Sequence, residues 1–141
     1  MQVTNSQTQA DATAESVKKI LTRIPNGFAI CPVRDVMDRI GDKWTLLTIM
    51  HLGTVETMRF NELRRHVAGV SQRMLTVTLR ALETDGLVVR TVYAEVPPRV
   101  EYSLTPLGYS LLEVVLSLGH WAAANAPAIA EARQRSAAMV A

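Results

Sequence analysis

The sequence predicts a mainly α-helical protein with a small β-hairpin, arranged as a winged helix-turn-helix with extra dimerisation helices at both termini. Three observations predict this class. Short segments with helical periodicity follow one another between residues 32 and 84. Over residues 87–104 the period of the apolar residues changes to two, which indicates strands. Further apolar stripes with helical spacing lie on both sides of this block.

The N-terminal segment is expected to hold one helix. Residues 1–10 are rich in Gln, Thr, Ser and Asn, and we interpret them as a loose tail. From Asp11 onward a helix is predicted, and Pro25-Asn26-Gly27 is expected to end it. One apolar stripe marks its inward face: Val17, Ile20, Leu21 and Ile24.

Two further helices are predicted before the helix-turn-helix. One begins near Cys31-Pro32, since proline suits a first helical turn, and Gly41 ends it. The next, Lys43 to Leu52, is apolar on almost every side. We therefore expect it to be the central, buried helix, with Gly53 as its C-cap.

The helix-turn-helix is predicted from residue 61 to residue 84. A short helix over residues 61–67 directs Phe60, Leu63 and Val67 inward, and Ala68-Gly69-Val70 forms the turn. Ser71 is a suitable N-cap for the second helix, Gln72 to Thr84, which Asp85-Gly86 ends. Two short helices followed by a hairpin are typical of a winged helix.

The hairpin and the last helix complete the order. Leu87 to Tyr93 and Val100 to Leu104 are rich in β-branched residues, and prolines stiffen the connection between them. Thr105-Pro106 opens a long helix that is expected to run to about Ala124, where Pro127 interrupts the pattern. The predicted organisation is a tail and dimerisation helix (1–30), a DNA-binding domain (31–104), and a C-terminal dimerisation helix and tail (105–141).

Composition restricts the classes of function. With 48% hydrophobic and 20% charged residues, the chain is not expected to be disordered. The N-terminus lacks the apolar run of a signal peptide, and no apolar stretch reaches the roughly 18 residues of a membrane helix, so we expect a cytoplasmic protein. Neither a Gly-rich phosphate loop, a metal-ligand cluster nor a partnered nucleophile is visible. We therefore expect no enzyme, no cofactor and no metal.

The helix from Gln72 to Thr84 is predicted to read DNA. Leu75, Leu79 and Leu82 share an inward face. The outward residues are of types that read base edges in the major groove, and Ser71 adds the helix N-terminus as a phosphate site. The outward set is Gln72, Arg73, Thr76, Val77 and Arg80. An ordinary surface helix shows the same pattern, but the neighbouring hairpin and the local charge favour DNA.

Local charge supports this interpretation. The formal net charge is only +2, yet residues 59–92 hold six arginines against three acidic residues. Arg64 and Arg65 are expected to hold phosphates, while Arg90 and Arg99 on the hairpin are expected to reach the backbone or the minor groove. A winged helix that binds proteins is the alternative, and it would favour a neutral or acidic recognition surface.

Several runs of residues occur in an order that is typical of one known family. They are Cys31-Pro-Val, Ile40-Gly-Asp-Lys-Trp-Thr-Leu-Leu, Arg59-Phe-Asn-Glu-Leu-Arg-Arg, Ser71-Gln-Arg-Met-Leu-Thr, Leu79-Arg-Ala-Leu-Glu, Asp85-Gly-Leu-Val and Val92-Tyr-Ala-Glu-Val-Pro-Pro-Arg-Val-Glu-Tyr-Ser-Leu-Thr. Together they cover about residues 31–121 and resemble the HxlR-type family of bacterial transcriptional regulators. The resemblance implies a winged helix, a homodimer formed through terminal helices, and a palindromic operator in double-stranded DNA. Such proteins often have a long polar residue at position 77, where this chain has Val77, which favours a different operator. Repression is the usual outcome for a small regulator.

A dimer is also expected from the apolar residues of the two terminal helices. The C-terminal helix has apolar residues on more than one face, among them Leu111, Val115, Leu118 and Trp121. With the N-terminal stripe at Val17, Ile20, Leu21 and Ile24, these residues predict a shared interface between two subunits. The alternative is that both helices pack only within their own subunit.

Cys31 is the single cysteine, so no disulfide can form within one chain. Its place before Pro32 at a predicted helix start, near Arg34, favours the thiolate, and such a cysteine could sense oxidants or electrophiles. Some members of the resembled family use a cysteine at this motif in this way. The equally weighted alternative is a small residue that fills space.

Overall fold

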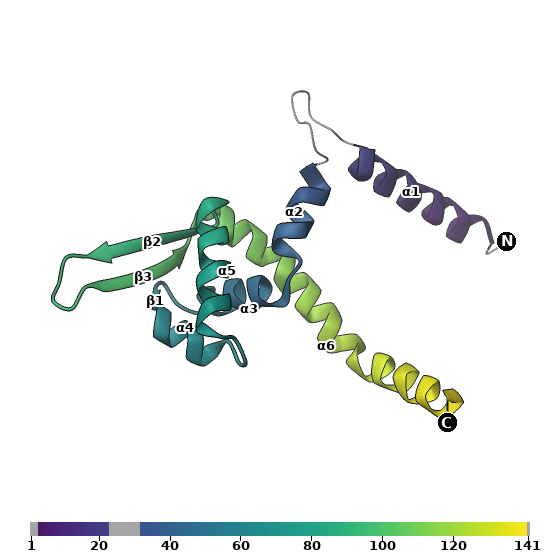
Figure 1. The fold of residues 1–141 in the computed structure, drawn as a ribbon. Coiled ribbons are helices and arrows are strands. Elements are labelled where there is room, and N and C mark those ends of the chain that lie inside the picture. Colours follow the sequence, from purple (N-terminus) through teal and green to yellow (C-terminus); the bar gives the residue numbers. More distant parts are fainter. Residues whose placement is uncertain (1–2, 23–31, 141) are drawn as a thin grey trace. The chain divides into compact units, whose positions relative to one another are not determined.

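The first unit contains two helices, α1 (Val3–Thr22) and α2 (Pro32–Ile40). The computed structural model describes residues 3–22 and 32–140, which divide into the units Met1–Asp42 and Lys43–Ala141 (Figure 1). Helix α2 confirms the prediction, but α1 begins at Val3, so the loose tail is wrong for residues 3–10. That stretch lacks Gly and Pro, and polar side chains alone do not prevent a helix. Ile24 and the expected Pro25-Asn26-Gly27 stop lie outside the described residues.

The second unit is a winged helix-turn-helix followed by a long helix. Its elements are α3 (Lys43–Leu52), β1 (Met58–Arg59), α4 (Phe60–His66), α5 (Gln72–Thr84), β2 (Val88–Tyr93), β3 (Arg99–Leu104) and α6 (Pro106–Val140). The turn between α4 and α5 contains Gly69, whose φ of 83° lies in the left-handed region that glycine tolerates. We call the hairpin of β2, β3 and residues 94–98 the wing; it extends away from α5 in Figure 1.

The sheet has three antiparallel strands in the order β1-β3-β2. Strand β1 was not predicted, because two residues are too short for a period to be recognised. It pairs Met58 with Tyr102 and Arg59 with Glu101, while Arg90 of β2 lies opposite Tyr102 of β3. This register attaches the start of α4 to β3, the middle strand of the sheet.

The core of the second unit forms where α3 packs against α5 and α6. Its largest fully buried side chains are Ile49, Leu52, Leu63, Leu75, Leu79, Leu82, Val67 and Thr48. Helix α3 is central as predicted, although Thr45 and Thr48 are buried while Leu46 and Leu47 remain half-buried. Gly53 directly follows the last residue of α3, as expected for its C-cap, and its amide donates to the carbonyl oxygen of Ile49 over 3.0 Å. A Cβ at Gly53 would lie 2.5 Å from Leu112 Cδ2, so this glycine also allows the close approach of α6.

Helix α6 begins as predicted but continues beyond the expected end. The amide of Gly108 donates to Thr105 Oγ1 over 3.0 Å, which is the expected N-cap. The helix passes through Pro127 and ends at Val140, not near Ala124. Proline removes one helical hydrogen bond, and the alanines on both sides of it, the strongest helix formers, favour continuation. Among the described helices, none combines the length and the apolar content needed to cross a membrane.

Candidate nucleic-acid interface

Helix α5 separates into a buried face and an exposed face. Leu75, Leu79 and Leu82 are buried as predicted, and Thr78 is buried with them. On the other side Gln72, Arg73, Val77 and Arg80 are exposed, and Thr76 is half-buried. We call these five outward residues the recognition face. Val77 keeps 53% of its surface exposed, so an apolar group stands among the polar ones.

The start of α5 is held by its N-cap. Ser71 Oγ accepts a hydrogen bond from the amide of Met74 over 3.1 Å, as predicted. One turn later, Thr76 Oγ1 donates to the carbonyl oxygen of Gln72 over 2.8 Å. The Ser71 oxygen and the Thr76 hydroxyl proton are therefore both used within the helix. Ser71 keeps its hydroxyl proton, and Thr76 its methyl group, for a ligand.

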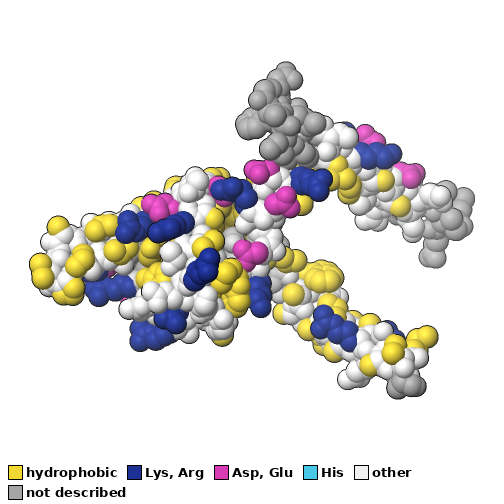
Figure 2. Space-filling model, viewed as in Figure 1, with side chains coloured by type: hydrophobic (Ala, Val, Ile, Leu, Met, Phe, Trp, Pro, Cys, Tyr) yellow, Lys and Arg dark blue, Asp and Glu magenta, His cyan; other side chains and the backbone are white. Residues whose placement is uncertain are grey.

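Exposed arginines also lie on the elements that precede and follow α5 in the chain. Arg64 and Arg65 lie on α4, and Arg90 lies on β2. Figure 2 shows Lys and Arg side chains over the wing, over α4 and over α5 on the same side of the second unit. Such a distribution produces a positive potential from a chain whose net charge is small.

Two hollows lie between these elements. The first, of about 460 Å³, is lined by the start of α4, by α5 and by both wing strands, through Phe60, Gln72, Thr76, Arg80, Glu83, Arg90 and Tyr102. The second, of about 870 Å³, lies between α4 and the start of β3, and its lining includes Arg59, Phe60, Arg64, Arg65 and Arg99. The structure therefore brings α5 and Arg90 together around one hollow, and Arg64, Arg65 and Arg99 around the other. Ser71, Arg73 and Val77 line neither hollow.

Several residues of these hollows were not predicted as site residues, among them Phe60, Arg59 and Glu83. Phe60 lines both hollows, although the sequence pointed only to an inward core residue. Arg59 lines the second hollow because it lies on β1, the strand that periodicity did not predict. Glu83 places an acid in the same hollow as Arg80 and Arg90. The sequence contained one usable signal, the position of Glu83 one helical turn after Arg80.

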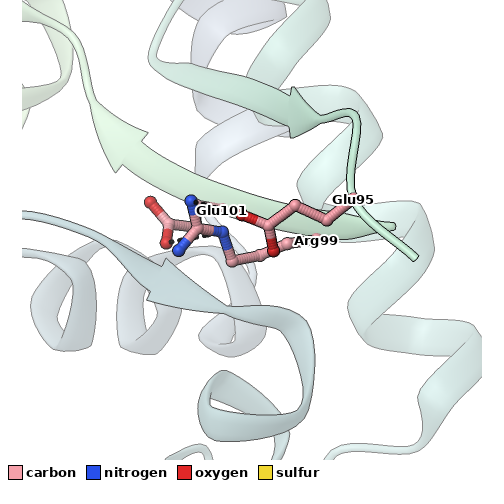
Figure 3. Close-up of polar contacts among 3 residues, drawn as sticks. All are labelled: Glu95, Arg99 and Glu101. Atoms are coloured by element: carbon pink, nitrogen blue, oxygen red, sulfur yellow. Dashed lines mark ion pairs between the residues drawn. The ribbon is translucent and has the colours of Figure 1, made fainter. Parts of the chain in front are cut away.

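Arg99 differs from the free basic side chain that was expected. Its Nη2 lies 3.3 Å from Glu95 Oε1, and its Nε lies 3.6 Å from Glu101 Oε1 (Figure 3). Its guanidinium carbon also lies 4.1 Å from the centre of the Tyr93 ring. These neighbours contact the guanidinium group from several sides, and its two carboxylate partners more than balance its charge.

The predicted interface residues separate into exposed and buried ones. Val17, Ile20, Leu21, Leu118 and Trp121 have between 48% and 59% of their surface exposed. Leu111 is half-buried. Val115 is a correction: it is 5% exposed and belongs to the core of its own chain, so it offers no surface to a partner. Ile24 and Cys31 lie outside the described residues.

The histidines form no metal site in the described part of the chain. His51 and His66 stack with their ring centres 5.7 Å apart, which joins α3 to α4. Within residues 3–22 and 32–140, no three His, Cys, Asp or Glu side chains come together in a way that could hold a metal ion.

Comparison with known proteins agrees with the geometry. Residues 39–130 match the family described as HxlR-like helix-turn-helix. The uncharacterized HTH-type transcriptional regulator YtfH of Escherichia coli K12 is 44% identical over 108 residues, which are 77% of this chain and 85% of YtfH. The solved structure of ytfH from Salmonella typhimurium has a TM-score of 0.70 at 39% identity and covers 79% of this chain and 99% of its own. The redox regulator HypR in its reduced form has a TM-score of 0.66 at 44% identity, over 71% of this chain and 98% of its own.

Proposed function

Because this chain belongs to the HxlR-like helix-turn-helix family and is a transcriptional regulator with a DNA-binding fold, we propose that it binds a palindromic operator as a homodimer. The recognition face of α5 carries this proposal. Its arginines and Gln72 are exposed, and its opposite side is fully used by the core. A helix in the major groove needs this division, because only outward side chains reach base edges.

Each part of the surface has a chemical role in the proposal. Arg73 and Arg80 donate in pairs to guanine O6 and N7, and Gln72 suits adenine. Val77 and the Thr76 methyl group contact thymine methyl groups. Arg64, Arg65 and Arg90 neutralise phosphates and position the helix without reading sequence.

Selection of bound duplexes from a random pool tests the proposal. We expect an inverted repeat whose two half-sites are centred roughly one helical turn, about 10 base pairs, apart or a multiple of it. Affinity for the selected duplex should fall steeply with salt, since phosphate contacts release counterions. A winged helix that binds proteins would enrich no duplex, and that outcome would exclude DNA as the ligand.

We further propose that α6 forms the dimer interface together with α1. Helix α6 exposes large apolar side chains along its length, which include Leu107, Val114, Leu116, Leu118 and Trp121. Helix α1 adds the exposed Val17, Ile20 and Leu21, and Ile24 continues this predicted stripe. Apolar groups repeated over several helical turns are typical of a surface that a second chain covers.

Leu118→Asp should separate the dimer. A carboxylate buried without a partner in an apolar interface costs roughly 3–5 kcal/mol, so dimerisation should weaken by at least about a hundredfold. Light scattering coupled to size exclusion at micromolar protein measures this change. Ser117→Asp is the matched control, because it adds the same charge at an exposed neighbouring position. A Leu118→Asp protein that remains dimeric would exclude this part of α6 from the interface.

We propose that the regulator represses transcription and that Cys31 makes it responsive to oxidants or electrophiles. HypR, with 44% identity, is named a redox regulator. Cys31 is the single cysteine of this chain, so a disulfide at Cys31 needs a thiol from another molecule. Diamide, which takes one hydrogen from each of two thiols, would join Cys31 to a second chain or to a small thiol.

Diamide should lower the affinity of wild-type protein for the selected duplex about tenfold or more, within the usual range of coupling between sites. Dithiothreitol should restore the affinity by reducing the disulfide. A gel shift before and after each reagent measures both steps. Cys31→Ser should bind the duplex like untreated wild type and ignore diamide. If wild type and Cys31→Ser respond alike, Cys31 has only a structural role.

A further inference from the structure

We propose that Arg99 is a positioning residue of the wing, which braces the tip formed by residues 94–98 and does not itself contact DNA. The inference rests on the proposed function and refines it, because a basic wing residue in this position was expected to touch phosphate or the minor groove. Its contacts lie instead within the wing.

The contacts of Arg99 join both ends of the tip. Arg99 is the first residue of β3, and Glu95 precedes it by four residues on the other side of Val96-Pro97-Pro98. Their ion pair of 3.3 Å therefore closes the tip upon itself (Figure 3). Tyr93, the last residue of β2, is the register partner of Arg99, and the guanidinium group lies over its ring at 4.1 Å. Glu101 adds a contact along β3 at 3.6 Å.

The charges of the side chains in contact with Arg99 argue against a phosphate bound to this residue itself. Two carboxylates face one guanidinium group, so this group of three side chains carries a net negative charge. The side chain of Glu95 is 54% exposed, while that of Arg99 is 29% exposed. A phosphate that approached Arg99 would meet the Glu95 carboxylate as well. Arg90 differs, since it is exposed on β2 and none of its contacts within the described residues is an ion pair.

The contacts require an arginine. A guanidinium group is planar, so it can lie over an aromatic ring while its edges point to two carboxylates. A lysine ammonium is a point charge and cannot do both. Arg99→Lys therefore distinguishes the two roles, because a phosphate contact tolerates either cation and the brace requires the guanidinium group.

Three uncharged residues follow Glu95 in the braced tip. Val96 is fully exposed, and Pro97 and Pro98 are exposed beside it. A free loop of this kind would lose conformational entropy when it meets DNA, at about 0.5–1.5 kcal/mol for each ordered side chain. The contacts of Arg99 order the tip before it meets DNA, so less conformational entropy is lost on binding. Arg99 therefore contributes to affinity indirectly.

The test compares arginine variants at two wing positions, with the duplex selected by wild-type protein as the probe. Arg99→Met and Arg99→Lys should both weaken binding by about tenfold, a loss comparable to the ordering of one or two side chains, and should leave the salt slope unchanged. Because a dimer carries two copies of Arg90, Arg90→Met should flatten the slope by about two, and Arg90→Lys should restore it. Melting temperatures of all four proteins identify any variant that fails to fold.

Glu95→Ala is a second test, because a charge effect and loss of the brace would change the affinity for DNA in opposite directions. Removal of an exposed acid beside DNA should tighten binding if only charge matters, whereas loss of the brace should weaken it by a few fold, since each ordered side chain contributes that much. The brace is overturned if Arg99→Met flattens the salt slope and Arg99→Lys restores it. It is also overturned if Glu95→Ala tightens binding. If neither the wild-type protein nor the two Arg90 variants bind the duplex in a salt-dependent way, the proposed function is contradicted instead.

Discussion

A protein that carries both Arg73→Ala and Arg80→Ala should lose about a thousandfold or more of its affinity for the selected operator. Each arginine that reads a base contributes about 1–3 kcal/mol, and a dimer presents four such arginines, so the total loss is roughly 4 kcal/mol or more. Both side chains are exposed, and neither contributes to the core. The folded state should therefore persist, and circular dichroism can verify this alongside a gel shift.

The matched control removes the same charge elsewhere. Arg133 and Arg135 are exposed on the C-terminal part of α6, so Arg133→Ala with Arg135→Ala changes the net charge equally. We expect this protein to bind the operator within a few fold of wild type, because distant charges act only through a screened field. Equal losses in the two double variants would show that α5 contributes charge and no sequence reading.

Gly108→Ala should destabilise the second unit by about 3 kcal/mol or more, at the upper end of the range for an overpacked site. An alanine Cβ would lie deep inside van der Waals contact with the carbonyl oxygen of Leu87. That carbonyl accepts a hydrogen bond from the amide of Thr105 over 3.1 Å, and Thr105 Oγ1 donates to Gly86 over 2.6 Å. The backbone at this junction of α5, the wing and α6 therefore has little freedom to move. Thermal unfolding should show a melting temperature lower by roughly 10 °C or more.

Gly119 provides the control within the same helix. The nearest atom to a Cβ at Gly119 would be Met50 Cε at 3.9 Å, an ordinary contact. Gly119→Ala should therefore stabilise the protein by about 0.5–1 kcal/mol, because alanine loses less backbone freedom than glycine in a helix. If Gly108→Ala unfolds at the same temperature as Gly119→Ala, the junction does not impose the constraint described here.

The helix-turn-helix could be predicted from the sequence because local signals agree there. Helix α5 has a capping serine, a leucine spacing that matches a helix, and glycines with positive φ in the turns before and after it. These signals act within a few residues, and they led to the same bounds that the structure shows. The outward residues of α5 followed directly from the same spacing.

The remaining features depend on contacts between distant residues. Strand β1 exists because Met58 and Arg59 pair with β3, more than forty residues later. Val115 has the same apolar character as Leu118, and only the packing of α6 decides that one is buried and the other is exposed. Arg99 carries a positive charge in the sequence, but neighbours from both strands determine its role. Periodicity carries no information about any of these contacts.

The central claim is that the outward side of α5 enters the major groove twice in each complex. Protection of guanine N7 from dimethyl sulfate tests it most directly, because this atom lies in the major groove and is the acceptor that arginine uses. We predict two symmetric sets of protected guanines about one helical turn apart, or a multiple of it, with one guanine in each set exposed again by Arg73→Ala. Binding that protects no guanine N7, or the same protection pattern with Arg73→Ala, would contradict the account.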